Sequence, residues 1–488
     1  MQANEIDYSR KWHAMAAVAM GVFLATIDAS IVNIALPTLV RELQADFATV
    51  QWVVLAYLLA LTTLMLGVGR LADMKGKRPL YTAGFVVFTI GSVLCGLSPT
   101  VYWLIGFRVL QAIGAAMILA LGAAILTEAF PPHERGKALG LFGTVVSVGI
   151  VVGPTLGGLL IDALSWHWIF FVNLPVGIVG TLIAMRFVPA IKPAGGQRFD
   201  FRGAITLGVS LLCLSLALTI GQQLGFGDSR ILSLFAGWVV FTALFVVTEL
   251  RVRQPMIDLR LFRNALFSVN LVTGFITFVA IGGSFILLPF YLENVLRYDT
   301  RQVGLLLAAV PLGLGVTAPI SGTLSDRLGT RRITVVGLTV LLVGYTALST
   351  LTAETDSFGF LLRYVPLGIG MGIFQSPNNS AIMGSAPRER LGVVSGLLSI
   401  MRTIGQTTGI AVLGAMWASR VFAHAGAVVP GGATATLPAF QVAALRDTLT
   451  VIAALVAVGL MLGIWGLAQE RRAQAMAAVA EPSPQESV

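Results

Sequence analysis

Long apolar runs, bounded by charged residues, proline or glycine, recur along the whole chain. Each run lasts about 20 residues or more, the length that a helix needs to cross a membrane. None has the alternation of about ten residues that is typical of an outer-membrane barrel. The pattern predicts fourteen transmembrane helices with short connections, except for a small-residue loop over 419–446. The predicted helices cover residues 12–36, 49–71, 79–98, 101–127, 137–162, 166–189, 203–224, 230–250, 267–293, 302–324, 332–352, 358–383, 391–418 and 447–468.

The composition excludes a soluble enzyme. Hydrophobic residues make up 56% of the 488 positions and charged residues 11%, whereas soluble domains carry about 25% charged residues. Neither Gly76-Lys77 nor Gly136-Lys137 is followed by Ser or Thr, so a phosphate-binding loop for ATP is missing. The two cysteines and four histidines are scattered. We therefore predict neither a metal site nor a catalytic group, and no cofactor beyond a coupling proton.

The basic residues predict the orientation in the membrane. With the N-terminus inside, 23 of the 32 Lys and Arg residues fall in inner segments and six in outer ones, while three lie within spans. Inner loops of membrane proteins carry such an excess. The chain is therefore expected in the cell (inner) membrane with both termini cytoplasmic. Its net charge of +9 then reflects this topology and not nucleic-acid binding.

An internal repeat divides the chain. Positions 69, 73, 76 and 78 recur at a constant offset of 253, as Gly69 and Gly322, Asp73 and Asp326, Gly76 and Gly329, Arg78 and Arg331. Repeats with an even number of spans are parallel, and such transporters bind their substrate between the two halves near the midplane. We predict an all-α membrane protein with six-helix bundles at 1–189 and 267–470. A linker at 190–266 carries two inserted helices, and a disordered tail covers 471–488.

Two ionisable residues within the first bundle are candidates for proton coupling. Asp28 is the only acid deep within a predicted span, about 24 Å along the first helix, and Arg108 lies about 10 Å below the outer face on the fourth. At these depths the two side chains can meet. A carboxylate that gains and loses a proton as Arg108 approaches or retreats would act as a coupling device. The alternative is a static pair, but the repeat offset places Ile281 opposite Asp28, which favours function.

Two further arginines lie within spans of the second half. Arg402 is near the middle of the thirteenth predicted helix. It would either contact substrate or bond to backbone carbonyls at a helix break near Gly405. Arg363 lies closer to the outer end of its helix, where a long side chain reaches the interface.

The repeated loop suggests a conformational latch. Asp73 and its counterpart Asp326 are placed to accept hydrogen bonds from a helix N-terminus in the opposite half. Such a contact exists in only one of two conformations and would bias the equilibrium between them. The plain alternative is a basic loop that only sets topology.

Glycines spaced by four mark one face of the fifth predicted helix. Such spacing lets another helix approach closely, and an internal proline removes a helix hydrogen bond. The second half has no copy of this pattern. The set comprises Gly149, Gly153, Pro154, Gly157 and Gly158.

These motifs together resemble the major facilitator superfamily, and within it the fourteen-span drug/proton antiporters. Residues 28–37 are similar to the family's first-helix motif, and residues 69–78 to its signature loop. Arg108 with Gln111 and Gly114 resembles the fourth-helix motif. Residues 149–158 resemble the antiporter motif, and residues 166–175 a fourteen-span hallmark, with His167 where Arg is usual.

The resemblance implies proton-driven efflux of amphipathic or lipophilic compounds by alternating access, with Asp28 as the coupling carboxylate. The expected partners are such substrates, protons and membrane lipids, for a protein acting as a monomer; a periplasmic adaptor is left open. Alternatives are a narrow-substrate exporter, a lipid translocase, or a membrane sensor that transports nothing. From helix position, the predicted cavity residues are Trp52, Tyr57, Asn173, Gln375, Asn378, Arg402 and Gln406.

Overall fold

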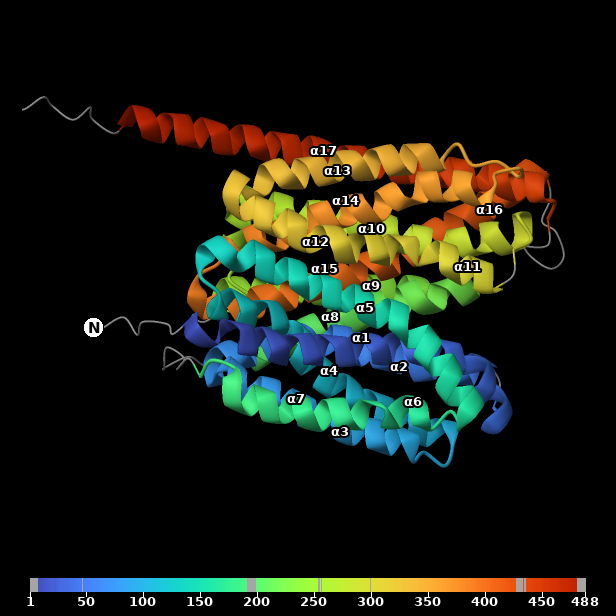
Figure 1. The fold of residues 1–488 in the computed structure, drawn as a ribbon, viewed down its shortest axis with the longest axis horizontal. Helices are drawn as coiled ribbons and strands as arrows, with labels where there is room; N and C mark the ends of the chain where they lie inside the picture. The colour runs from blue at the N-terminus through green and yellow to red at the C-terminus, as the bar shows by residue number, and fades with distance from the viewer. Residues whose placement is uncertain are drawn as a thin grey trace, which may run out of the picture.

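The computed structural model describes residues 8–45, 47–190, 199–252, 255, 257–298, 300–426, 433 and 436–480. These residues are folded mainly into long helices that run side by side (Figure 1). Thirteen helices of the described part are long and apolar enough to cross a membrane. The remaining predicted span, at 391–418, consists of α15, a π-helical turn over Gly409–Leu413, and α16. The chain is thus a multi-pass membrane protein.

The helices fall into three groups along the chain. The first half contains α1–α7, the inserted pair is α8 and α9, and the second half contains α10–α17. The bounds are α1 Lys11–Glu42, α2 Phe47–Lys75, α3 Lys77–Gly96, α4 Val101–Ala129, α5 Arg135–Ala163, α6 Trp168–Phe171, α7 Asn173–Phe187, α8 Phe201–Leu224, α9 Ser229–Arg251, α10 Ala265–Phe290, α11 Thr300–Leu307, α12 Ala309–Leu328, α13 Thr330–Leu348, α14 Ser357–Gly384, α15 Leu391–Thr408, α16 Gly414–Ala425 and α17 Pro438–Ala480.

Two predicted spans are each split into two helices. The span predicted at 166–189 breaks after Phe171, and the one at 302–324 breaks after Leu307. Proline follows four residues later in both cases, as Pro175 and Pro311. Because proline lacks an N–H and its ring clashes with the carbonyl four residues earlier, the helix cannot continue regularly through these points.

The predicted disordered tail is wrong for its first ten residues. Helix α17 continues to Ala480, because residues 471–480 include five alanines and two arginines, which favour helix. Residues 481–488 lie outside the described part. The predicted loop at 419–446 is also shorter than expected, since α16 ends at Ala425 and α17 begins at Pro438.

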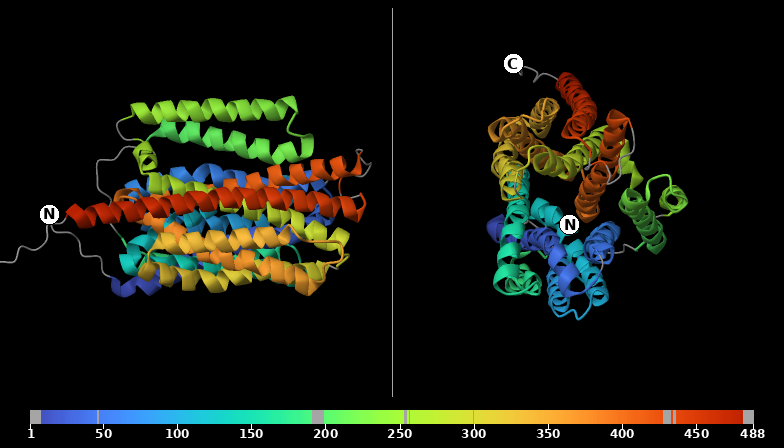
Figure 2. Two further views of the ribbon diagram at one scale, coloured as in Figure 1. Left: turned by 90° about the horizontal axis from the view of Figure 1, so that it is seen from above. Right: turned by 90° about the vertical axis from the view of Figure 1, so that its right-hand side faces the viewer.

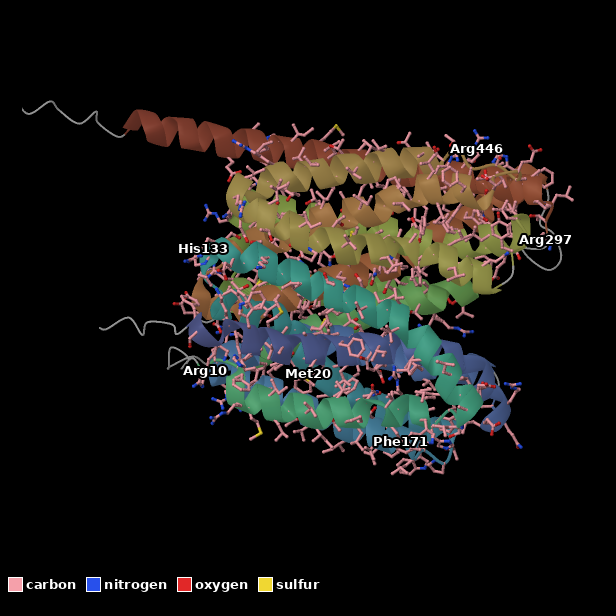
Figure 3. The ribbon with its side chains drawn as sticks, in the orientation of Figure 1. Arg10, Met20, His133, Phe171, Arg297 and Arg446 are labelled. Atoms are coloured by element: carbon pink, nitrogen blue, oxygen red, sulfur yellow. The ribbon has the colours of Figure 1, made fainter. Side chains whose placement is uncertain are left out.

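Helix α1 begins and helix α17 ends at the same end of the bundle (Figure 1). We call this the terminal end and the opposite one the distal end. Arg10 and His133 lie at the terminal end, while Arg297 and Arg446 lie at the distal end (Figure 3).

The two halves meet along two seams. Helix α2 packs against α15 in one seam, and α5 packs against α12 in the other. The inserted helices α8 and α9 pack on each other and stand at the edge of the molecule (Figure 2). Helix α8 contacts both α2 and α15, so the inserted pair lies along the first of these seams.

Candidate functional site

Asp28 on α1 forms the centre of a buried polar network in the first half. Its Oδ2 accepts a hydrogen bond from Arg108 Nη1 at 2.6 Å, and its Oδ1 accepts from Gln111 Nε2 at 2.8 Å and Asn173 Nδ2 at 2.9 Å. The relative exposure of Asp28 is 0% and that of Arg108 is 1%. Asp28 and Arg108 are therefore in direct contact, as predicted, and neither side chain faces lipid.

Arg108 links this network to α2. Its Nε donates to the Val53 carbonyl at 3.1 Å, and its guanidinium lies 4.0 Å from the centre of the Tyr57 ring. Tyr57 is buried. A guanidinium over an aromatic face gains electrostatic attraction that is stronger when both groups are desolvated. Tyr57, predicted to line the substrate cavity, packs against the ion pair in this structure.

Asn173, another residue predicted for the cavity, also belongs to this network. It begins α7, is buried, and donates one bond to Asp28 and another to Ser92 Oγ at 2.9 Å. Gln111 also donates to Ser92, and Ser92 donates to the Phe170 carbonyl. The sequence reasoning did not identify Ser92, because a serine within an apolar span usually bonds to its own helix.

The glycine stripe of α5 packs against α1 beside Asp28. A side chain at Gly149 would collide with Thr26, and one at Gly153 would collide with Ser30. Ser30 Oγ donates to the Gly149 carbonyl at 3.1 Å. The close approach that the glycine spacing predicts is therefore made to α1.

The rest of the stripe has a different environment. Gly157 is buried, while Gly158 has no atom within 4 Å of the place that a side chain would take. Helix α5 continues through Pro154 to Ala163.

Asp73 joins the end of α2 to the start of α15 in the other half. Its carboxylate accepts hydrogen bonds from the backbone N–H groups of Gly392 at 2.8 Å and Val393 at 3.0 Å. It also lies 3.1 Å from Lys77 Nζ. A side chain at Gly69 would collide with the Gly392 carbonyl, so glycine is needed for this approach. The negative charge sits at a helix N-terminus, where it is stabilised.

Asp326 makes the equivalent contact in the opposite direction. It lies near the end of α12 and accepts bonds from the N–H groups of Gly136 at 3.0 Å and Lys137 at 3.1 Å, at the start of α5. Ser376 Oγ donates to the Gly136 carbonyl, and Thr144 Oγ1 donates to the Gly315 carbonyl. Both seams are therefore closed at the terminal end.

The remaining latch residues have separate roles. Gly76 and Gly329 have φ of 95° and 90°, a conformation that favours glycine, and each forms the tight turn after an aspartate. Arg331 pairs with Glu470 at 3.0 Å within its own half. Arg78 is half-buried and makes no hydrogen bond or ion pair with any residue that the structure describes.

In the described part of the chain, no hydrogen bond or ion pair joins the other predicted cavity residues to one another. Trp52, Gln375, Arg402 and Gln406 are half-buried. Arg402 donates no hydrogen bond to a backbone carbonyl within the described chain, and the helix departs from α geometry only at Gly409–Leu413, beyond the predicted break.

Asn378 is also not an open lining residue. It is buried on α14, and its Nδ2 donates to the Asn270 carbonyl of α10 at 3.2 Å. It therefore ties two helices of the second half together.

Comparison with known proteins agrees with this architecture. The sequence profile of the Major Facilitator Superfamily matches residues 18–410. The chain belongs to this superfamily, whose members are membrane transporters and not enzymes.

Two bacterial relatives are similar over most of the chain. The riboflavin transporter RibZ of Clostridioides difficile is 33% identical over 410 residues, which cover 84% of this chain and 89% of RibZ. The multidrug resistance protein Stp of Mycobacterium tuberculosis is 34% identical over 405 residues, 83% of this chain and 75% of Stp. The relatives thus include a multidrug resistance protein and a transporter named for one compound.

A solved structure confirms the fold. The crystal structure of the human organic anion transporter MFSD10 (TETRAN) matches with a TM-score of 0.64 and 16% identity, covering 93% of this chain and 99% of that one. At this identity the likeness concerns the fold alone.

Proposed function

We propose that this protein exports amphipathic or lipophilic compounds across the cell membrane in exchange for protons, with both termini in the cytoplasm. The observation that supports the exchange most directly is the sealed contact between Asp28 and Arg108. Asp28 lies near the middle of α1 and is fully buried, whereas Asp447, nine residues into α17, is partly exposed and pairs with His424. Ionisable groups within membrane spans are energetically unfavourable and are associated with proton relays.

The geometry suggests how a proton would act. While Asp28 is ionised, it balances the charge of Arg108 and accepts bonds from α4 and α7. A proton on Asp28 would leave Arg108 buried beside a neutral partner, which is unfavourable. The guanidinium would then depend on the Val53 carbonyl and Gln111 Oε1. Because α1, α2 and α4 share these contacts, protonation would change how they pack.

The latches would define one of the two transport states. With both seams closed at the terminal end by Asp73 and Asp326, a central site would face the distal side. If the terminal end is cytoplasmic, this is the state in which a proton enters from outside and substrate leaves. Inward proton movement gains about 2.3 kcal/mol per 100 mV of membrane potential.

The decisive experiment is dye efflux with an imposed pH gradient, in proteoliposomes or everted vesicles. We expect Asp28→Asn to abolish gradient-driven transport while substrate binding is retained. Asp162→Asn is the matched control, because Asp162 is exposed at the distal end of α5. Transport by Asp28→Asn at the wild-type rate would place the coupling site elsewhere.

A narrow-substrate exporter is the second candidate function. The relative named as a riboflavin transporter, with similar coverage and identity, favours it. Transport assays with riboflavin and with chemically unrelated dyes separate the two. Efflux of one compound only, without competition by the dyes, would support the narrow exporter over the multidrug one.

A further inference from the structure

Arg402 is a charged residue deep within the second half that the coupling network does not use. It lies eleven residues after Leu391, the start of α15, or about 16 Å from the terminal end at 1.5 Å per residue. This is close to the middle of a core about 30 Å thick. Helix α15 packs against α2, α4 and α10, so it lies between helices rather than against lipid.

Within the described part of the chain, the guanidinium of Arg402 has no counter-charge. It makes no hydrogen bond or ion pair with any described residue, and no charged side chain among these residues offsets the burial of its charge. Asp28, the buried acid of the first half, is bound to Arg108. Nevertheless Arg402 is only half-buried. The charge of Arg402 is therefore neither neutralised by a described partner nor fully buried.

The neighbours of Arg402 on α15 indicate which side it faces. Ser399, three residues earlier, donates to the Leu119 carbonyl of α4 in the other half at 3.2 Å. Gln406, four residues later, is half-buried and shares this helix face. Gly405 packs against Phe275 and Phe278 of α10. Arg402 thus lies between the surface facing α4 and the surface facing α10, with an amide side chain on the same helix face.

An uncompensated cation in this position selects for one class of ligand. A guanidinium binds carboxylates, sulfonates and phosphates through two parallel hydrogen bonds, and electrostatic attraction is stronger away from bulk water. The same charge repels lipophilic cations, and the buried carboxylate of Asp28 is already paired with Arg108. The buried apolar residues beside it on α15 and α10, such as Met401, Ile404 and Phe278, suit the rest of an amphipathic molecule.

We propose that Arg402 binds the anionic group of the substrate, so that this protein carries amphipathic organic anions and discriminates against lipophilic cations. The inference rests on the proposed export function, because it identifies the substrate class of the same transporter.

Binding is measured first, without any gradient, by the fluorescence anisotropy of dyes added to purified protein in a non-ionic detergent. The dyes share a xanthene ring: fluorescein is the anion and rhodamine 6G the cation. We expect the wild type to bind fluorescein more tightly than rhodamine 6G. Arg402→Gln should weaken fluorescein binding by about tenfold or more, the effect of losing a hydrogen bond to a charged group. Arg402→Lys should weaken it less.

The control is Arg363→Gln, which removes an arginine of the same half near the distal end of α14 and should leave fluorescein binding unchanged. Arg402→Glu should reverse the preference in favour of rhodamine 6G, a gain that a misfolded protein would not show. The proposal is overturned if Arg402→Gln binds fluorescein like the wild type. It is also overturned if the wild type binds neither dye or prefers rhodamine 6G.

Transport is measured separately in proteoliposomes with an imposed pH gradient. Fluorescein binding that depends on Arg402, without gradient-driven movement, would reject the proposed export function and leave the anion site standing. Gradient-driven transport of rhodamine 6G that Arg402→Gln does not affect would reject the anion site and leave proton-coupled export standing.

Discussion

At the scale of single residues, one carboxylate connects four helices of the first half. Asp28 on α1 accepts bonds from Arg108 and Gln111 on α4 and from Asn173 on α7, and Arg108 reaches a carbonyl of α2. A change in the charge of Asp28 therefore alters the contacts of all four helices. Arg108 is the residue that connects α2 to this network.

Replacing Arg108 by lysine should damage transport although the charge is kept. An ammonium group cannot match the fixed fork of donors that reaches Asp28, Gln111 and the Val53 carbonyl, nor stack in the same way on Tyr57. We expect Arg108→Lys to lower gradient-driven efflux by about tenfold or more, equivalent to about 1.4 kcal/mol. Efflux assays in everted vesicles measure this, with Arg363→Lys as the control. Equal losses of efflux in Arg108→Lys and Arg363→Lys would contradict this prediction.

The sequence predicts the depth of these residues better than the direction in which they point. The rise of a helix is constant, so residue counting correctly places Asp28 and Arg108 at one level. Which face a side chain occupies depends on how each helix is rotated. For this reason Tyr57 and Asn173, predicted for the cavity, are found around the ion pair, and Ser92 was missed.

At the scale of secondary-structure elements, close contact between α1 and α5 positions the coupling carboxylate. The contact depends on Gly149 and Gly153, which face Thr26 and Ser30 of α1. These two α1 residues flank Asp28 in the sequence. Any displacement of α1 by α5 is thus transmitted to the ion pair.

We expect Gly153→Ala to reduce both stability and efflux. The added methyl group would collide with Ser30 and lie 3.2 Å from the Ile27 carbonyl, and overpacking of this kind costs about 1–3 kcal/mol. Thermal unfolding of the purified protein and dye efflux measure the two effects. Gly158→Ala is the control on the same helix, since its methyl group would meet no atom within 4 Å. A Gly153→Ala variant as stable and active as Gly158→Ala would rule out this packing role.

The sequence predicts most spans but not their interruptions. Apolar runs mark where a helix lies in the membrane, because side chains there face lipid or other helices. They do not show where a backbone carbonyl lacks the N–H donor that would continue the helix. Pro175 and Pro311 follow the breaks after Phe171 and Leu307 and are the sequence signal for them. Pro154, however, lies within the continuous helix α5, so a proline alone does not predict a helix break.

At the scale of the whole molecule, two reciprocal contacts close the terminal end. Asp73 of the first half reaches the start of α15, and Asp326 of the second half reaches the start of α5. The internal repeat predicts this symmetry, since both aspartates belong to the repeated loop. The sequence does not reveal which conformation the chain adopts, because the same contacts would be absent in the other one.

Asp73→Asn should shift the equilibrium toward the conformation that is open at the terminal end. The amide keeps one acceptor but loses the charge that favours the α15 N-terminus, an effect worth about 0.5–2 kcal/mol. Spin labels on Lys75→Cys and Glu389→Cys, both at exposed positions, report the separation of the halves when Cys95 and Cys213 are replaced. We expect a larger population of long distances than in Asp162→Asn. Identical distance distributions in the two variants would rule out a latch.

The position of the inserted pair makes the molecule asymmetric toward the bilayer. Helix α8 lies beside α2 and α15, whereas the described part of the chain has no such extra helix beside α5 and α12 (Figure 2). A compound dissolved in the membrane therefore meets the inserted pair on the flank beside α2 and α15, and no extra helix of the described chain on the flank beside α5 and α12. Under the proposed export of lipophilic compounds, lateral entry from the lipid phase would be unobstructed by the inserted pair only beside α5 and α12, and the neighbours of this protein in a crowded membrane would meet two different sides.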